Sequence, residues 1–193
     1  MTPDSIKRLA DLLSELPSLG PRQATRLAFH IAGMPTDEVT ELARVLEETA
    51  RLKRCIQCFR IDALEKGLCT ICNNPRREQD TVAIVEKETD VLTLEKTKAF
   101  KGRYLVIGDL PKDGILNNQH KQRLSVIKDG TPLSEIVICF ASTTYGDMGA
   151  SIVADQLKNV CKKITRLARG IPTGGEIEFA DEQTLESAIR NRR

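Results

Sequence analysis

The sequence predicts an α/β protein in which a helical region and a four-cysteine knuckle precede a mainly parallel sheet. Three observations support this fold class. Apolar residues follow helical spacing up to residue 51, and four cysteines between residues 55 and 72 form two Cys-x-x-Cys pairs. After residue 80, short apolar runs alternate with helical segments. Such runs, separated by helices, are typical of a parallel sheet that is covered on both faces.

Three helices are expected before the cysteines. The first ends at Pro17, the second begins at Pro21 and ends near Gly33, and the third spans residues 37–51. Two helices of this size do not close a core alone, so we expect the third helix and the cysteine knuckle to close it with them.

The turn between the first two helices resembles a helix-hairpin-helix nucleic-acid module, with its hairpin at Ser18, Leu19 and Gly20. A tight turn before a helix N-terminus directs free backbone N–H groups at a phosphate, and Arg22 and Arg26 lie one helical turn apart beside it. Such contacts do not read base sequence. The module usually has Gly where this chain has Ser18, which costs about 1 kcal/mol if that residue needs a positive φ. An ordinary helix hairpin with two solvated arginines is the alternative.

The cysteines Cys55, Cys58, Cys69 and Cys72 have the spacing C-x2-C-x10-C-x2-C, which predicts a structural Zn²⁺ site. Four thiolates complete a tetrahedron and leave no open coordination position, so the metal is not catalytic. Buried or redox-active cysteines and an iron–sulfur cluster are the alternatives. Cys139 lies in an apolar run and is expected in the core, and Cys161 has no predicted function.

From residue 81 onward the sequence predicts strands at residues 81–85, 104–108, 136–140 and 164–167. A short helix follows the first strand, and a longer one spans residues 147–160. The chain then ends with a Gly-Gly turn, a strand at residues 176–179 and a terminal helix. Ligands or partners of a parallel sheet usually meet the loops at the carboxyl ends of its strands.

Composition excludes several classes of protein. The net charge is +2, from 29 Lys and Arg against 27 Asp and Glu. The composition is therefore not basic enough to indicate nucleic-acid binding by itself. With no Trp, two Tyr and five Phe, a wall of base-stacking aromatics is not expected. We find no membrane span, export signal or P-loop, and we expect a cytoplasmic protein that does not use ATP.

Two basic clusters favour a nucleic-acid path only weakly, because a run of charges is usually a solvated face. One surrounds the cysteines and the other occupies residues 158–169. His30 and His120 are too far apart in the sequence to suggest a catalytic triad.

The order of these motifs resembles the RecR family of bacterial recombination mediators. The hairpin, the cysteine spacing and the ending Thr-Arg-Leu-Ala-Arg-Gly-Ile-Pro-Thr-Gly-Gly-Glu at residues 165–176 carry the resemblance, which runs nearly end to end. It implies a helix-hairpin-helix DNA-binding region at residues 1–53, a four-cysteine zinc finger at 54–78, a Toprim-like α/β domain at 79–175 and a C-terminal assembly segment at 176–193. Arg22 and Arg26 match the positions where the family carries its DNA-binding basic residues.

The resemblance also implies partners and a process. Members of the family work with RecO, and in some systems RecF, to help RecA load onto gapped or single-stranded DNA. They assemble as rings or clamps around DNA, so we expect a ring-like homo-oligomer, a tetramer, that associates with the nucleoid during repair.

The α/β domain must be tested for catalysis. Toprim enzymes hold Mg²⁺ with an acidic residue after the first strand and an acidic pair after the third. Glu86 takes the first place and Asp147 one position of the pair, but Tyr145 replaces the other carboxylate. We therefore expect no enzyme, and Glu86, Glu88 and Asp147 are interpreted as a surface that docks RecO. A Mg²⁺-dependent Toprim nuclease or primase-like enzyme and a zinc-ribbon adaptor that binds only protein are the alternatives.

Overall fold

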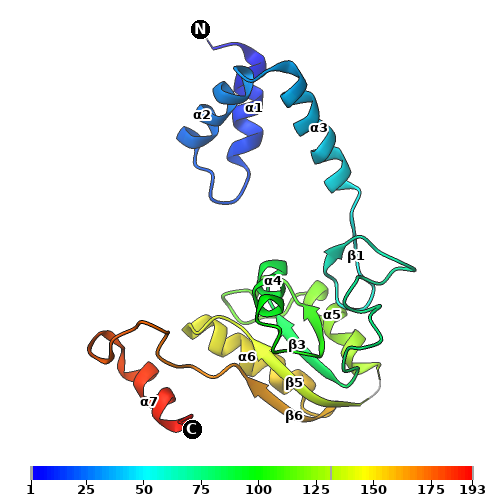
Figure 1. Ribbon diagram of the computed structural model, residues 1–193, viewed down its shortest axis with the longest axis vertical. Coiled ribbons are helices and arrows are strands. Elements are labelled where there is room, and N and C mark those ends of the chain that lie inside the picture. The colour runs from blue at the N-terminus through cyan, green and yellow to red at the C-terminus, as the bar shows by residue number, and fades with distance from the viewer. Residues whose placement is uncertain (1, 131, 193) are drawn as a thin grey trace. The chain divides into compact units, whose positions relative to one another are not determined.

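The computed structural model describes residues 2–130 and 132–192 (Figure 1). The chain forms two compact units, one that ends at Leu52 and one that begins at Lys53. Within the described residues, no helix has both the length and the apolar character that crossing a bilayer requires.

The first unit consists of the three expected helices, α1 (Asp4–Ser14), α2 (Pro21–Ala32) and α3 (Thr36–Ala50). Pro21 occupies the first position of α2, where its fixed φ suits a helix start. Packing in this unit is thin, because α2 buries only Ala24 and Ala28, and α1 and α3 bury no residue. The buried side chains of the knuckle pack on the sheet of the second unit, and the expectation that the knuckle also helps to close the helical core stays a prediction.

The second unit contains a four-stranded, fully parallel sheet in the order β4-β3-β5-β6. Its strands are β3 (Thr81–Val85), β4 (Arg103–Val106), β5 (Leu133–Cys139) and β6 (Cys161–Arg166). The central strand β3 pairs with both β4 and β5, so Ile84 lies between Leu105 and Ile138. The predicted mixed α/β class with a mainly parallel sheet is confirmed.

Two buried clusters cover the two faces of this sheet. On one face, α5 (Asn118–Lys128) and α6 (Thr144–Leu157) pack their apolar residues on alternate positions of the strands. On the other face lie α4 (Glu88–Thr97) and the cysteine knuckle, which contains the two-stranded ladder β1 (Lys53–Arg54) and β2 (Ile61–Asp62). Side chains alternate between faces along a strand, so Ala83 and Val85 meet the knuckle side while Val82 and Ile84 meet α5 and α6.

Two predicted features of the second unit are wrong. The segment 144–147, expected as a loop, forms the first turn of α6, because the Thr143 hydroxyl accepts a hydrogen bond from the Gly146 N–H at 3.1 Å and caps the helix earlier. The expected strand at residues 176–179 is instead the 3₁₀ turn η1 (Ile177–Phe179). An isolated alternating segment has no neighbouring strand for its backbone, and here the Phe179 and Ala180 N–H groups bond three residues back. The terminal helix α7 (Glu182–Arg190) follows.

Candidate nucleic-acid hairpin, metal centre and acidic edge

The hairpin between α1 and α2 has the backbone that a phosphate-binding turn needs. Ser18 has φ 68°, in the left-handed region, so the cost anticipated for a serine at this place applies. Leu19 donates its N–H to the Leu16 carbonyl at 3.3 Å, which closes the turn. Gly20 is the N-cap of α2, and no side chain caps the N–H groups of the first turn. The start of α2 therefore offers unpaired donors at the positive end of a helix dipole.

The two candidate arginines of this hairpin are exposed. Arg22 and Arg26 lie on successive turns of α2. Neither makes an ion pair within the part of the chain that the structure describes. Their guanidinium groups are thus free to meet an anion beside the helix start.

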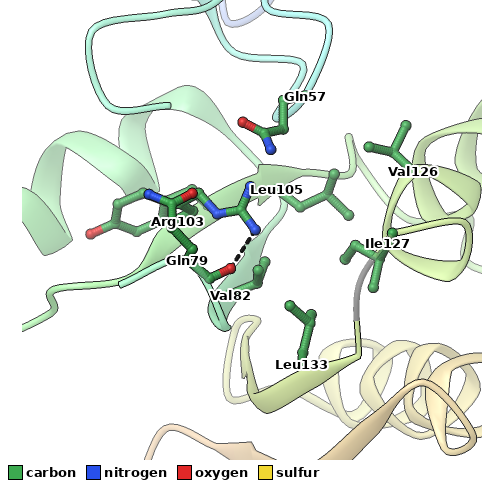
Figure 2. Close-up of a pocket in the computed structure, with 10 residues that line it drawn as sticks. Gln57, Gln79, Val82, Arg103, Leu105, Val126, Ile127 and Leu133 are labelled. Atoms are coloured by element: carbon green, nitrogen blue, oxygen red, sulfur yellow. Dashed lines mark hydrogen bonds between the residues drawn. The ribbon is translucent and has the colours of Figure 1, made fainter. Parts of the chain in front are cut away.

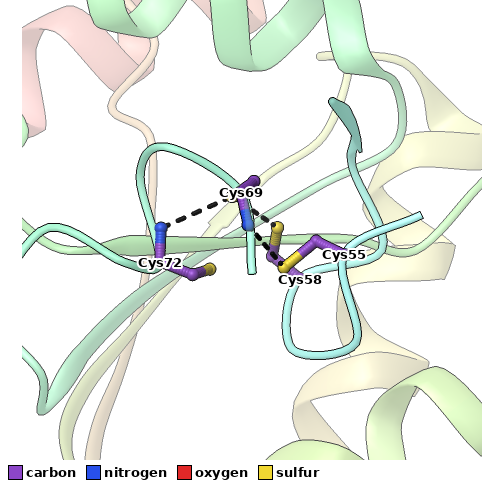
Figure 3. Close-up of side chains that lie close together, drawn as sticks. All are labelled: Cys55, Cys58, Cys69 and Cys72. Atoms are coloured by element: carbon purple, nitrogen blue, oxygen red, sulfur yellow. Dashed lines mark hydrogen bonds between the residues drawn. The ribbon is translucent and has the colours of Figure 1, made fainter. Parts of the chain in front are cut away.

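The four cysteines of the knuckle come together from two turns (Figure 3). Cys55, Cys58, Cys69 and Cys72 are all buried, and their sulfur atoms lie within 4.8 Å of one another. The Sγ atoms of Cys58 and Cys69 are 3.5 Å apart. Four sulfurs at the usual Zn–S distance of about 2.3 Å are roughly 3.8 Å from each other in a tetrahedron, so the spacing fits this metal.

Hydrogen bonds between the sulfurs favour the thiolate at Cys69. The thiols of Cys58 and Cys72 hold the pKa of Cys69 far below its usual range, whereas the contact with Cys69 raises the pKa of Cys58, and the contacts with Cys58 and Cys69 raise that of Cys72. The backbone N–H of Cys69 points at the Cys55 sulfur, and that of Cys72 at the Cys69 sulfur, each at 3.4 Å. Among the described residues, these cysteines are the one group of three or more His, Cys, Asp or Glu whose ligand atoms converge. The group can hold a metal ion.

The knuckle is bonded to the carboxyl end of β4. Val106 donates its N–H to the Cys58 carbonyl at 2.9 Å, and Arg123 of α5 donates to the Val106 carbonyl at 3.0 Å. The Arg123 guanidinium also lies 5.5 Å from the centre of the Phe59 ring, although Arg123 is only 5% exposed. Burial lowers the pKa of Arg123, and the charge of Arg54 lowers it further. The sequence did not predict the role of Arg123, because no pattern in the neighbouring residues indicates that this arginine is buried.

The three predicted docking carboxylates lie at the carboxyl edge of the sheet, and two of them are already ion-paired. Arg54 of β1 donates to Glu88 at 2.7 Å. Asp147 accepts hydrogen bonds from two arginines, Arg166 and Arg169, whose guanidinium groups hold the pKa of its carboxyl below the usual range. Glu86 makes no ion pair within the described residues. A cavity of about 350 Å³ at this edge is lined by Glu86, Asp90 and apolar groups that include Cys139 and Leu167.

This arrangement does not form the Mg²⁺ cage of a Toprim enzyme. Asp147 is turned to its two arginines and does not converge with Glu86 and a third acidic residue. Tyr145, which stands in the usual acidic position, is 59% exposed in the first turn of α6.

Several residues of the predicted basic clusters have internal partners. Arg60 pairs with Asp62, and Arg77 pairs with Glu95 and donates to two backbone carbonyls, those of Phe100 and Gly102. These arginines hold the knuckle and its exit segment in place. Lys158 and Lys163 also pair with carboxylates. These four side chains are thus less available to an anion than their sequence suggests.

A further cavity, of about 300 Å³, lies at the amino ends of the strands (Figure 2). Arg103 turns toward the Gln79 carbonyl at 2.5 Å, and apolar side chains such as Val82, Leu105 and Leu133 form the wall. The functional edge of a parallel sheet is the opposite one, so we assign no function to this cavity.

The histidines and the two remaining cysteines also have positions. His120 is buried, and its Nδ1 accepts the Asn117 N–H at 3.3 Å in the cap of α5, so it has a packing role. His30 is exposed near the end of α2. Cys139 lies in the core as expected, where burial raises the pKa of its thiol to about 12. Cys161, at the start of β6, is only partly buried.

Comparison with known proteins covers nearly the whole chain. Family models match at residues 6–50 (RecR, helix-hairpin-helix), 80–168 (Toprim domain) and 170–193 (RecR, C-terminal). The chain is 39% identical to recombination protein RecR of Rippkaea orientalis, 38% to that of Acidothermus cellulolyticus and 35% to that of Gloeobacter violaceus. Each alignment covers 97% of this chain and 96% of the relative.

Proposed function

Because the chain belongs to the RecR family of recombination proteins, we propose that it is a non-enzymatic DNA-binding mediator of recombinational repair. In this role it acts with RecO, and with RecF in systems that use it, to help RecA load onto gapped or single-stranded DNA. The observation that supports the proposal most directly is the hairpin, where a left-handed Ser18 and an uncapped helix start stand beside two exposed arginines.

In the proposed mechanism the hairpin holds the DNA backbone. The N–H groups at the start of α2 donate to one phosphate, and Arg22 and Arg26 reach adjacent phosphates. Phosphate oxygens look the same for every base, so binding is independent of sequence and is weakened by salt.

Zinc is the proposed cofactor, one ion per chain, held by Cys55, Cys58, Cys69 and Cys72. When bound, the ion would cross-link the two cysteine turns. It would have no catalytic role, because four thiolates fill its coordination sphere. The Cys58 carbonyl also accepts a hydrogen bond from the end of β4, so the metal turn and the sheet are fixed together.

The proposed docking surface for RecO is the carboxyl edge of the sheet around Glu86 and Glu88. Glu86 is the carboxylate that can meet a cation of the partner, because Glu88 and Asp147 already face arginines of their own chain. A role for Asp147 in this contact stays a prediction. We also propose a ring-like homo-oligomer, a tetramer, because it lets the hairpins of several subunits hold one DNA.

The alternative, a Mg²⁺-dependent nuclease or primase-like enzyme, has less support. It needs Asp147 as a metal ligand, and the two arginines compete for the same carboxylate. Incubation of the protein with labelled DNA and Mg²⁺ tests it directly. Cleavage that disappears in Glu86→Gln and Asp147→Asn would establish an enzyme and overturn the proposal.

The experiment for the DNA interface is a titration of labelled DNA with the double variant Arg22→Glu, Arg26→Glu at several salt concentrations. Loss of two duplex phosphate contacts reduces the slope of log K against log salt by about 1.8. The matched control is Lys112→Glu, Lys121→Glu, which makes the same change of charge at two exposed positions outside the hairpin. If the two double variants lose the same affinity, or if only one DNA sequence is affected, backbone recognition by the hairpin is refuted.

A further inference from the structure

Asp147 and its two arginines form a cluster with an excess of positive charge. Arg166, the last residue of β6, donates its Nη2 to Asp147 Oδ1 at 2.5 Å, and Arg169 donates to the same oxygen. Two guanidinium groups share one carboxylate, so the cluster has a net charge of +1. The carboxylate is 31% exposed, so solvent reaches the cluster.

A cavity of about 310 Å³ opens beside this cluster. Both arginines and Asp147 line it, together with the polar side chains Ser142, Ser187 and Asn191. It lies at the carboxyl ends of β5 and β6, which is the edge where parallel sheets bind ligands. Within a single chain, these polar groups therefore surround an open space.

Donors remain free in this cavity. A guanidinium group has five N–H donors. In the part of the chain described here, Arg166 and Arg169 each direct one hydrogen bond at Asp147, and the hydroxyls of Ser142 and Ser187 donate none. Arg169 is only 18% exposed, so its guanidinium is held in place before a ligand arrives, while Arg166, at 41%, reaches solvent.

We propose that this cluster binds one phosphodiester group of a DNA strand, through Arg166 and Arg169, as a phosphate contact separate from the hairpin. A phosphodiester has a single negative charge, which matches the net charge of the cluster, whereas a free phosphate or a terminal phosphate has close to two at neutral pH. Asp147 keeps the arginines oriented and lowers the affinity for anions in general. The inference rests on the proposed DNA binding of the chain.

A purely structural role is the competing interpretation. In that case the ion pairs of Asp147 only hold residues 166–169 against the start of α6, and replacement of Asp147 or of the arginines changes DNA affinity in the same direction. A phosphate site instead predicts that the two changes have opposite effects on DNA affinity. Removal of the Asp147 carboxylate releases the arginines and strengthens binding, whereas removal of an arginine removes a phosphate contact and weakens it.

The test measures fluorescence anisotropy of a fluorescein-labelled gapped duplex over a range of NaCl concentrations. We expect Arg166→Gln, Arg169→Gln to weaken binding about fivefold and to reduce the slope of log K against log salt by about 0.9, the value for one duplex phosphate. Asp147→Asn should strengthen binding by a similar factor. Equal weakening by both variants, or no effect of either, would overturn the proposal. Thermal melting of each variant in zinc-containing buffer shows whether it is folded.

Two further arms separate the sources of phosphate and the two proposals. Dimethyl phosphate should displace the duplex at least as well as inorganic phosphate at equal ionic strength, and a clear preference for inorganic phosphate would reassign the cavity to a free dianion. One outcome is that the hairpin variant Arg22→Glu, Arg26→Glu abolishes the dependence of log K on log salt while the variant Arg166→Gln, Arg169→Gln leaves it unchanged. In that case only this inference fails. If the unmodified protein does not bind the duplex, the proposed function fails.

Discussion

Replacement of Tyr104 by Phe should destabilise the second unit in a way that depends on pH. The Tyr104 hydroxyl donates to Glu95 Oε1 at 2.7 Å, and Arg77 pairs with the other oxygen of that carboxylate. The Tyr104 ring is 3% exposed and packs beside Phe100 at a centroid distance of 5.1 Å. Tyr104→Phe keeps this packing and removes one hydrogen bond to an ionised group.

The size of the effect follows from that bond. A hydrogen bond to a charged group contributes about 1.5–3 kcal/mol, and water replaces part of it here because the Glu95 side chain is 28% exposed. We therefore expect a loss of about 1.5 kcal/mol in the free energy of unfolding, or roughly 3–6 °C in Tm for a chain of this size. Tyr145→Phe is the matched control, since that side chain is 59% exposed and should change stability by less than about 0.5 kcal/mol.

The pH dependence has a definite sign. Burial acts to raise the pKa of Glu95, but the hydrogen bonds from Arg77 and Tyr104 outweigh it and hold the pKa below the usual 4.5. A carboxyl group with a lowered pKa in the folded state stabilises the protein above its unfolded pKa and loses that contribution as the pH falls through the folded pKa. The difference between wild type and Tyr104→Phe should thus be constant above about pH 5 and shrink in acid. Urea unfolding followed by far-UV circular dichroism measures it. An equal difference in acid, or none at neutral pH, would refute the reasoning.

Three other outcomes are expected. Ser18→Gly relieves the left-handed backbone at φ 68° and should stabilise the first unit by up to about 1 kcal/mol in urea unfolding, whereas a loss of stability would contradict the turn geometry. Cys72→Ser should abolish the zinc content measured by atomic absorption and speed hydrogen exchange at the Val106 amide; one zinc per variant chain would disprove the proposed ligand set. Iodoacetamide should modify Cys161 before Cys139 in the zinc-loaded protein, because the Cys139 thiol is buried with a pKa of about 12; the reverse order in a mass spectrum would contradict this.

The features that sequence predicted correctly depend on neighbours in the chain. Pro21 starts a helix, and Ile84 lies in a continuous apolar run that is typical of a central parallel strand. The paired cysteines of the knuckle likewise stand close together because two residues separate the members of each pair. Local rules of this kind do not require knowledge of the tertiary fold.

The features that sequence missed depend on contacts between distant residues. Arg54 and Glu88 are 34 positions apart, and Arg169 and Asp147 are 22 apart, so no spacing rule joins them. Helix α5 was missed for a different reason: its cap at Asn117 is local, but only Leu124 and Ile127 supply buried apolar side chains along its length. The same limit applies to residues 176–179, where alternating polarity suggests a strand and only the fold shows that no partner strand is beside it within the described chain.

The hydrogen bond between Val106 and Cys58 connects the cysteine turn to an outer strand of the sheet. An outermost strand with vacant amides is a template on which other chains can polymerise. In this protein the cysteine turn occupies an amide of β4 at that boundary. If the cysteine turn holds the proposed zinc ion, a chelator that releases the turn should also expose this edge of β4 and lower the solubility of the protein.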